Sequence, residues 1–245
     1  MSLWFRKVKA QGRLRARVLA FPNAGGGATV FHAWPAQLPS GTELLAARYP
    51  GRQERLNEPP MLSLAELADA ITSELTERLD APLVLFGHSV GASIAHEVAL
   101  RLEAETADQP ALLVVSAGRG PGRGRPLGST KDNDDALIAE IVRLGGAEAA
   151  AYEDPELREL LLPMLRADYR VRATYAPSIE PVQCPVVSYV GDADPGCSVD
   201  EARSWSQIAA GGFDLRVFPG NHFFLVPQEK AVLADLSARI AQLSW

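Results

Sequence analysis

The stretch VLFGHSVGASIAHEVA, residues 84–99, decides the fold that this sequence predicts. It begins as an apolar run typical of a buried strand and ends with the apolar spacing of a helix. Between the two parts stands Ser89, with Gly87 two residues before it and Gly91 two residues after it. Turns normally use Asn, Asp, Gly or Pro, which suit unusual backbone angles. A serine at this point therefore needs a chemical explanation.

The five residues 87–91 match the pattern G-x-S-x-G, placed after a strand and before a helix. In that context the pattern indicates a nucleophile elbow, a tight turn that exposes a reactive serine at the carboxyl edge of a sheet. Gly87 and Gly91 leave room for the turn, and the following helix aims its first amides at the serine. We therefore predict that Ser89 is a nucleophile. The alternative, a serine with only a structural role, fits this context poorly.

Strands and helices alternate along most of the chain. Short apolar runs predict strands at residues 15–21, 43–49, 82–87, 111–118, 185–191 and 213–220. Helical patterns are found at residues 63–79, 92–105, 198–209 and 228–243. This alternation is typical of an α/β fold with a mostly parallel central sheet flanked by helices on both faces.

The alternation is interrupted once, where two helical patterns follow each other without a strand between them, DNDDALIAEIVRLGG and DPELRELLLPMLRADYRVRATY. We expect residues 119–175 to form a helical lid insertion, and residues 1–118 and 176–245 to form the core. Insertions in α/β folds are often functional, but an ordinary pair of packing helices remains the alternative.

A serine hydroxyl needs a base to become a nucleophile, and the chain holds only four histidines. In this type of fold the nucleophile, the acid and the histidine follow one another along the chain. His222, in the segment FPGNHFFLV after the last strand, satisfies that order. The others are expected to be packing or surface residues, namely His32, His88 and His96.

The acid that orients the histidine is expected on the loop after the strand before it. The segment VVSYVGDADPGCS offers two carboxylates, Asp192 and Asp194. The acid usually stands a few residues beyond the strand, which favours Asp194, whereas Asp192 suits a turn cap. Asp192 remains the alternative.

An oxyanion hole needs two backbone N–H groups, one from the residue after the nucleophile and one from a loop after an early strand. The first would be Val90, and the loop would be FPNAGGGATVF, residues 21–31. Within that loop we choose Ala24, with Asn23 close behind. The glycines could also make a flexible turn or a phosphate loop, yet neither GxxxxGK[ST] nor GxGxxG is present. No cofactor and no metal are therefore expected.

Composition excludes several classes of protein. The chain has 245 residues, 47% of them hydrophobic, and a net charge of −6, which gives no overall attraction to nucleic acid or to an anionic membrane. Cys184 and Cys197 have no metal-ligand or disulfide spacing and are expected to pack in the core. Neither a signal peptide nor a membrane-spanning run is evident. We expect a cytoplasmic protein, and a monomer.

Taken together, these residues resemble the type II thioesterases that accompany polyketide and nonribosomal peptide synthases. The resemblance extends over nearly the whole chain, in the blocks FPNAGGGATVFHAW, YPGRQERLNEPP, FGHSVGASIAHEVA, LLPMLRADYRVRATY, GDADP and GNHFFL. The family usually has Met after the nucleophile and Gly before the histidine, where this chain has Val90 and Asn221. Val90 contributes only its backbone amide, whereas Asn221 bears on how the histidine loop is held.

The resemblance implies an editing thioesterase, which hydrolyses acyl thioesters from the phosphopantetheine arm of acyl or peptidyl carrier proteins. It implies Ser89 as the nucleophile, His222 as the base and Asp194 as the orienting acid, under a helical lid. A general carboxylesterase or lipase with the same three residues is the alternative, and so is a non-catalytic binding module.

Three arginines, Arg119, Arg123 and Arg125, stand in a loop rich in Gly and Pro that leads into the expected lid. Guanidinium groups bind phosphate and carboxylate oxygens in pairs, so these side chains suit an acidic carrier protein and the phosphate of its arm. A solvated loop without a partner is the alternative.

Overall fold

The computed structural model of the chain describes residues 3–8, 10–75, 80–105, 109–122 and 133–243. Its centre is a seven-stranded sheet with the order β1-β3-β2-β4-β5-β6-β7. The strands are β1 (Phe5–Val8), β2 (Ala16–Phe21), β3 (Thr42–Ala47), β4 (Leu83–His88), β5 (Leu112–Ser116), β6 (Val186–Gly191) and β7 (Phe213–Phe218). All neighbouring pairs are parallel except β1 and β3. The expected parallel sheet is confirmed.

β1 was not among the predicted strands; it pairs antiparallel with β3 at the edge of the sheet. Of its four residues only Phe5 is buried, and the next two, Arg6 and Lys7, are exposed. An edge strand needs few apolar residues, and charges on it discourage pairing with other chains. It therefore lacks the apolar pattern that reveals the inner strands.

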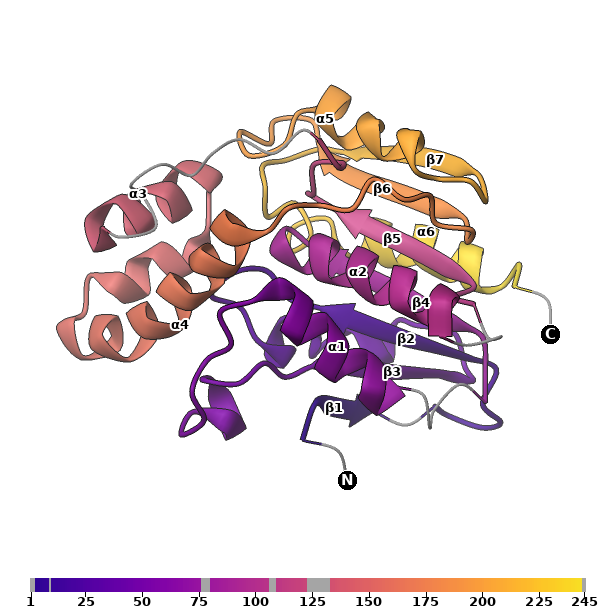
Figure 1. Cartoon of the computed structure of the whole chain (residues 1–245), viewed down its shortest axis with the longest axis horizontal. Helices are drawn as coiled ribbons and strands as arrows, with labels where there is room; N and C mark the ends of the chain where they lie inside the picture. The colour runs from indigo at the N-terminus through magenta and orange to yellow at the C-terminus, as the bar shows by residue number, and fades with distance from the viewer. Residues whose placement is uncertain (1–2, 9, 76–79, 106–108, 123–132, 244–245) are drawn as a thin grey trace.

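Helices cover both faces of the sheet (Figure 1). They are α1 (Leu64–Leu75), α2 (Val90–Glu105), α3 (Asp134–Leu144), α4 (Pro155–Thr174), α5 (Val199–Arg203) and α6 (Glu229–Ile240). In Figure 1, α1 and α2 lie in front of the sheet and α6 lies behind it. The pattern expected at residues 198–209 is divided, because α5 ends at Arg203 and a 3₁₀ helix follows over Ser204–Gln207. Among the described helices none is long and apolar enough to cross a membrane.

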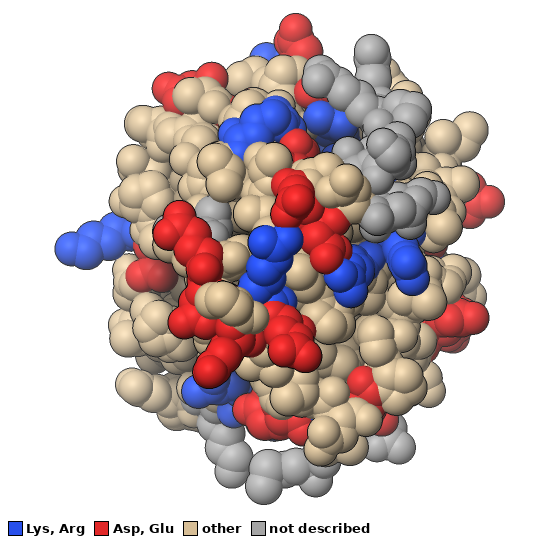
Figure 2. Space-filling model, turned by 90° about the vertical axis from the view of Figure 1, so that its left-hand side faces the viewer, with Lys and Arg blue, Asp and Glu red and all other residues tan. Residues whose placement is uncertain are grey.

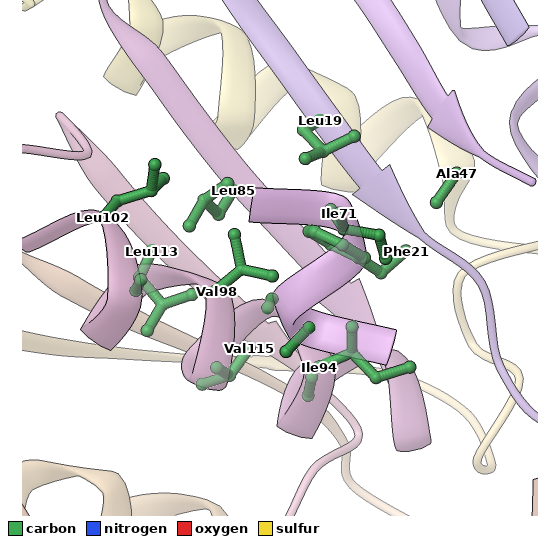
Figure 3. Close-up of a cluster of buried hydrophobic side chains, with 14 of the residues drawn as sticks. Leu19, Phe21, Ala47, Ile71, Leu85, Ile94, Val98, Leu102, Leu113 and Val115 are labelled. Carbon is green, nitrogen blue, oxygen red and sulfur yellow. The ribbon is translucent and has the colours of Figure 1, made fainter. Parts of the chain in front are cut away.

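Alternating residues of the strands supply the two cores. In β4, Leu83 and Leu85 point to the side of α1 and α2, whereas Val84 and Phe86 point to the side of α6. Figure 3 shows the first core, where Leu85 and Phe21 of the sheet face Ile71 of α1 and other side chains of α2. Burying one such side chain contributes about 1.5–3 kcal/mol. Because both faces are covered, every residue of the inner strands β2–β6 is buried, whereas the edge strands β1 and β7 are partly exposed.

The insertion contains α3, a 3₁₀ helix at Ala147–Tyr152, and α4. These helices lie beyond the carboxyl edge of the sheet, on the left of Figure 1. They have a small apolar core of their own, formed by Leu137, Ile141, Tyr152, Leu162, Leu165 and Tyr169. Ala24, from the loop after β2, packs against this core. The insertion thus contacts the edge at which the candidate site residues gather.

Candidate active site

Ser89 lies at the tip of the turn between β4 and α2, with φ of +58°. This left-handed backbone is strained for a residue with a side chain. A Cβ on Gly87 would come within 2.1 Å of the carbonyl oxygen of Gly91, and one on Gly91 within 2.2 Å of that of Phe21. The two glycines are therefore required by close packing, as the sequence indicated. The N–H of Ser89 donates to the carbonyl of Ser116 on β5 at 2.8 Å, which ties the turn to the sheet.

A chain of hydrogen bonds joins three of the expected residues. The Oγ of Ser89 lies 2.9 Å from Nε2 of His222. The other ring nitrogen of His222, Nδ1, lies 2.9 Å from Oδ2 and 3.0 Å from Oδ1 of Asp194. The side chain of His222 is 5% exposed and that of Asp194 is fully buried, so the imidazole is shielded from water on the side of the carboxylate. The structure thus brings together Ser89, His222 and Asp194.

Asp192 and Asp194, the two carboxylates predicted as alternatives for the orienting acid, have different partners in the loop after β6. Oδ1 of Asp194 accepts from the backbone N–H groups of Gly196 at 2.6 Å and Cys197 at 3.1 Å, which hold the carboxylate toward the histidine. Asp192 is exposed, and its Oδ1 accepts from the N–H of Gly220 at 2.9 Å. Asp192 therefore holds the start of the histidine loop instead of the imidazole.

Asn221, which replaces the glycine usual in the family that the sequence resembles, holds the histidine loop from within. Its Oδ1 accepts from the N–H of Phe223 at 2.8 Å. Its side chain also lies against Gly145 at the end of α3, where a Cβ would come within 2.1 Å of Nδ2 of Asn221. Gly145 has φ of +83° and ends α3 as a left-handed cap. The histidine loop and the insertion are thus in direct contact.

The remaining histidines occupy other places. His88 is buried, its Nδ1 lies 2.9 Å from Oγ of Ser116, and its ring packs 5.5 Å from that of His222. Burial lowers the pKa of His88 to about 3. His96 packs edge-on against Trp205, and burial lowers its pKa to about 4. His32 is exposed. Among the described residues, none of these three histidines forms a hydrogen bond with Oγ of Ser89.

Val90 and Ala24 have the free backbone amides that an oxyanion hole requires. Val90 is the first residue of α2, whose N-terminal N–H groups have no partner within the helix. Among the described residues, the N–H groups of Val90 and Ala24 donate to no other group. Asn23, the alternative to Ala24, is buried, and its Nδ2 donates to the carbonyl of Ala24 at 2.9 Å.

A buried ion pair that was not predicted from the sequence, Arg52 with Asp168, holds this loop. Arg52 donates from Nη1 to Oδ2 of Asp168 at 2.8 Å and from Nη2 to Oδ1 at 2.6 Å. The same Oδ2 accepts from the N–H of Gly25 at 2.8 Å, and Nη1 of Arg52 also donates to the carbonyl of Gly26 at 2.9 Å. Arg52 follows β3 and Asp168 lies on α4, so the pair joins the core, the insertion and the loop of Ala24. Both residues lie in sequence blocks that carry the family resemblance. That resemblance was the only indication in the sequence that they have a role in the site.

Two cavities flank this group of residues. One, of about 380 Å³, is lined by Ser89, His222, Glu140 and two arginines, Arg119 and Arg172. The other, of about 640 Å³, is mostly apolar, and its walls come from the loop after β2, from α4 and from the histidine loop. Its lining includes Asn23, His88 and Phe223.

The arginines expected to meet a carrier protein are described only in part, because Arg123 and Arg125 lie outside the described residues. Arg119 lines the smaller cavity, and its side chain is 10% exposed, with Nε 3.4 Å from Oε1 of Glu201. Figure 2 views the molecule from the side of the insertion and shows basic and acidic side chains interspersed on that face. Arg119 is thus a residue of the cavity and not of the outer surface.

Comparisons with known proteins agree with this arrangement. The family described as "Thioesterase domain" matches residues 16–240. The "Probable cadicidin biosynthesis thioesterase" of Streptomyces griseus is 38% identical over 235 residues, which are 96% of this chain. The chain spans 65% of that relative's length. "Thioesterase PikA5" of Streptomyces venezuelae is 37% identical over 240 residues, 96% of this chain and 85% of the relative.

Solved structures of type II thioesterases have the same fold. "Type II thioesterase BorB from the borrelidin biosynthetic cluster" superimposes with a TM-score of 0.88 at 36% identity and covers 98% of each chain. "YbtT - Type II thioesterase from Yersiniabactin NRPS/PKS biosynthetic pathway" superimposes with a TM-score of 0.84 at 28% identity and covers 96% of each chain. The resemblance drawn from the sequence is confirmed. The chain therefore belongs to the thioesterase family, whose enzymes hydrolyse thioester bonds, and it adopts the α/β-hydrolase fold of the type II thioesterases that it resembles.

Proposed function

We propose that this protein is an editing thioesterase that releases acyl groups from the phosphopantetheine arm of acyl or peptidyl carrier proteins. The observation that carries the proposal is the hydrogen-bond chain from Oγ of Ser89 through His222 to the buried Asp194. The names of similar proteins support the substrate class, because one is called a thioesterase and another a type II thioesterase from an NRPS/PKS biosynthetic pathway.

The reaction would proceed in two halves. Nε2 of His222 takes the proton of Ser89 while Oγ attacks the thioester carbonyl, and the resulting oxyanion accepts from the N–H groups of Val90 and Ala24. The carbon–sulfur bond then breaks, and His222 returns the proton to the leaving thiolate. Water, activated by the same imidazole, hydrolyses the acyl-Ser89 ester. Asp194 fixes the tautomer with a proton on Nδ1 and stabilises the imidazolium that forms.

The insertion suits the role of a lid, because it contacts both the loop after β2 and the histidine loop. Ala24 packs against its apolar core, and Asn221 lies against the end of α3. The apolar cavity under α4 suits an aliphatic acyl chain, since Leu160, Leu161 and Met164 contribute to its wall. We propose residues 119–175 as the lid and the rest of the chain as the core, acting as a monomer.

The test uses Ser89→Ala and a carrier protein loaded with an acyl-phosphopantetheine. Intact-protein mass spectrometry follows the loss of the acyl group. We expect wild type to deacylate the carrier and Ser89→Ala to retain only the residual catalysis of the oxyanion hole and binding, roughly a thousandth of the rate or less. Ser206→Ala, which changes an exposed serine, is the control. More than a tenth of wild-type activity in Ser89→Ala would contradict the assignment.

A matched pair of small substrates distinguishes a thioesterase from a general carboxylesterase. An acyl-pantetheine thioester and the corresponding oxygen ester present the same acyl group to Ser89. We expect a higher kcat/KM for the thioester. Equal or reversed values would favour the general esterase, and failure of a serine-directed phosphonate to label Ser89 would favour a binding module.

A further inference from the structure

The last turn of α3 contacts the loop that carries the proposed orienting acid. Nη1 of Arg143 donates to the carbonyl oxygen of Pro195 at 3.0 Å. The next residue, Leu144, packs against Gly196, where a Cβ would come within 2.6 Å of Cδ2 of Leu144. Pro195 and Gly196 directly follow Asp194 along the chain. The insertion therefore binds the acid loop immediately beside the carboxylate that contacts the histidine.

The carbonyl that Arg143 binds belongs to the same peptide group as an N–H that binds the acid. The bond between Pro195 and Gly196 joins this carbonyl to the N–H of Gly196, which donates to Oδ1 of Asp194 at 2.6 Å. A peptide group is a rigid plane, so a contact that fixes its oxygen also fixes the direction of its N–H. A charged donor on the oxygen also polarises the group and strengthens the hydrogen bond of the N–H.

This peptide group lies close to the imidazole as well as to the carboxylate. A Cβ on Gly196 would come within 2.9 Å of Nδ1 of His222 and 3.1 Å of Oδ1 of Asp194. The N–H of Cys197 donates to the same Oδ1 at 3.1 Å, so two backbone donors hold this oxygen. The peptide group of Gly196 is the one that the insertion binds. A displacement of that group would move the carboxylate relative to the imidazole.

Glu140, one turn earlier on α3, orients the guanidinium of Arg143. Nε of Arg143 donates to Oε2 of Glu140 at 2.6 Å and Nη2 donates to Oε1 at 2.8 Å. This bidentate pair leaves Nη1 directed at Pro195. The hydrogen bonds to Glu140 raise the pKa of Arg143, and the charge of Asp194 raises it further. The guanidinium is therefore charged and has a fixed direction.

We propose that Arg143 is a positioning residue for Asp194 and acts through the peptide group between Pro195 and Gly196. The inference rests on the proposed function, because Asp194 serves the reaction only by orienting His222. Arg143 is not among the described residues that line the cavity of Ser89, so it acts without touching the substrate. Its loss should therefore lower kcat and leave KM nearly unchanged. The insertion thus contributes to the geometry of the acid in addition to covering the site.

The test compares Arg143→Gln with a matched control, Arg166→Gln. The side chains of the two arginines are 46% and 42% exposed. Each binds both oxygens of one carboxylate on α3, that of Glu140 for Arg143 and that of Asp134 for Arg166. Only Arg143→Gln also removes a donor to the acid loop. Half-exposed ion pairs add little to stability, so both variants should fold.

The kinetic readout is kcat and KM on an acyl-pantetheine, per active site counted with a serine-directed phosphonate. We expect Arg143→Gln to lower kcat about threefold to tenfold, the effect of one hydrogen bond, with KM within about twofold of wild type. Arg143→Met, which keeps the aliphatic part of the side chain, should have the same effect and provides a second variant. Arg143→Lys should recover part of the loss, because it keeps a charged donor for Pro195. Arg166→Gln should retain the kcat of wild type.

A spectroscopic readout separates this inference from the proposed function. The proton on Nδ1 of His222, bonded to the carboxylate of Asp194, gives a downfield proton NMR resonance that needs no turnover and is assigned by its loss in Asp194→Asn. In a Ser89→Ala background we expect Arg143→Gln to shift or broaden this resonance and Arg166→Gln to leave it unchanged.

The same kcat and the same resonance in the two arginine variants would overturn the proposal, whether both variants equal wild type or both are equally impaired. Turnover of the thioester by Ser89→Ala would instead overturn the proposed nucleophile. In that case the resonance would still show whether Arg143 holds the acid.

Discussion

Asp168→Asn tests whether the ion pair with Arg52 holds the loop of Ala24. The substitution keeps the shape of the side chain but removes the charge, and it leaves the guanidinium of Arg52 buried, at 3% exposure, without its counter-ion. Removing one partner of a buried ion pair costs about 3–5 kcal/mol. Since a domain is typically stable by about 5–15 kcal/mol, this is a large fraction of the total.

The assay is equilibrium urea denaturation at pH 7, together with kcat on an acyl-pantetheine. Asp135→Asn is the control, because Arg158 and Asp135 form a pair whose side chains are 38% and 85% exposed. An exposed pair contributes about 0–1 kcal/mol. If the free energy of unfolding of Asp168→Asn were no more than about 1 kcal/mol below that of the control, the pair would not hold the loop. We also expect kcat to fall, since the N–H of Gly25 is held by Oδ2 of Asp168.

The double variant Arg52→Met/Asp168→Leu separates stability from catalysis. Replacing both ions by apolar side chains removes the unpaired buried charge, and such replacements are often neutral or stabilising. We therefore expect the free energy of unfolding to recover toward that of wild type. The N–H of Gly25 still lacks its acceptor, so kcat should stay low. Recovery of both quantities would mean that the pair has no role in positioning the loop.

Three further predictions concern other parts of the structure. Asp194→Asn should lower kcat about 10⁴-fold because the histidine takes the wrong tautomer. Asp192→Asn should mainly reduce the stability of the fold. A larger loss of kcat for Asp192→Asn on the same thioester would reverse the assignment of the acid. The unfolded chain protonates His96 below pH 6.5 but the folded protein only near pH 4, so stability should fall between these values as pH decreases. His96→Leu should reduce that slope in denaturation curves by up to ~1.4 kcal/mol per pH unit, and an unchanged slope would contradict the buried neutral state. Gly91→Ala should prevent folding, because its Cβ would lie 2.2 Å from the carbonyl oxygen of Phe21; a native circular dichroism spectrum would refute this.

The link between the loop of Ala24 and α4 has a consequence for the proposed lid. Oδ2 of Asp168 holds the N–H of Gly25, so a movement of α4 relative to the core would change the position of the loop amides. The end of α3 contacts Asn221 beside the histidine. The insertion therefore touches the two loops on which the proposed chemistry depends, and lid position and catalytic geometry are physically coupled.

Much of this protein follows from local sequence patterns. The inner strands and the main helices were predicted because apolar spacing reports local burial, and the elbow at Ser89 was predicted because its two glycines are required within five residues of chain. The choice of His222 needed only the order of residues along the chain and the small number of histidines. These features are encoded by neighbours in sequence, so a single sequence is enough to find them.

Other features exist only after distant segments meet. The pairing of Arg52 with Asp168 joins residues 116 positions apart, and nothing near either residue indicates its partner. The different places of Asp192 and Asp194 depend on the histidine loop, which folds back from beyond β7. The direction of Arg119 into a cavity depends on α4 closing its far side. A charged residue has the same local pattern whether it faces water, a partner or a ligand, and only the tertiary structure decides among them, because that choice is made by the groups packed around it.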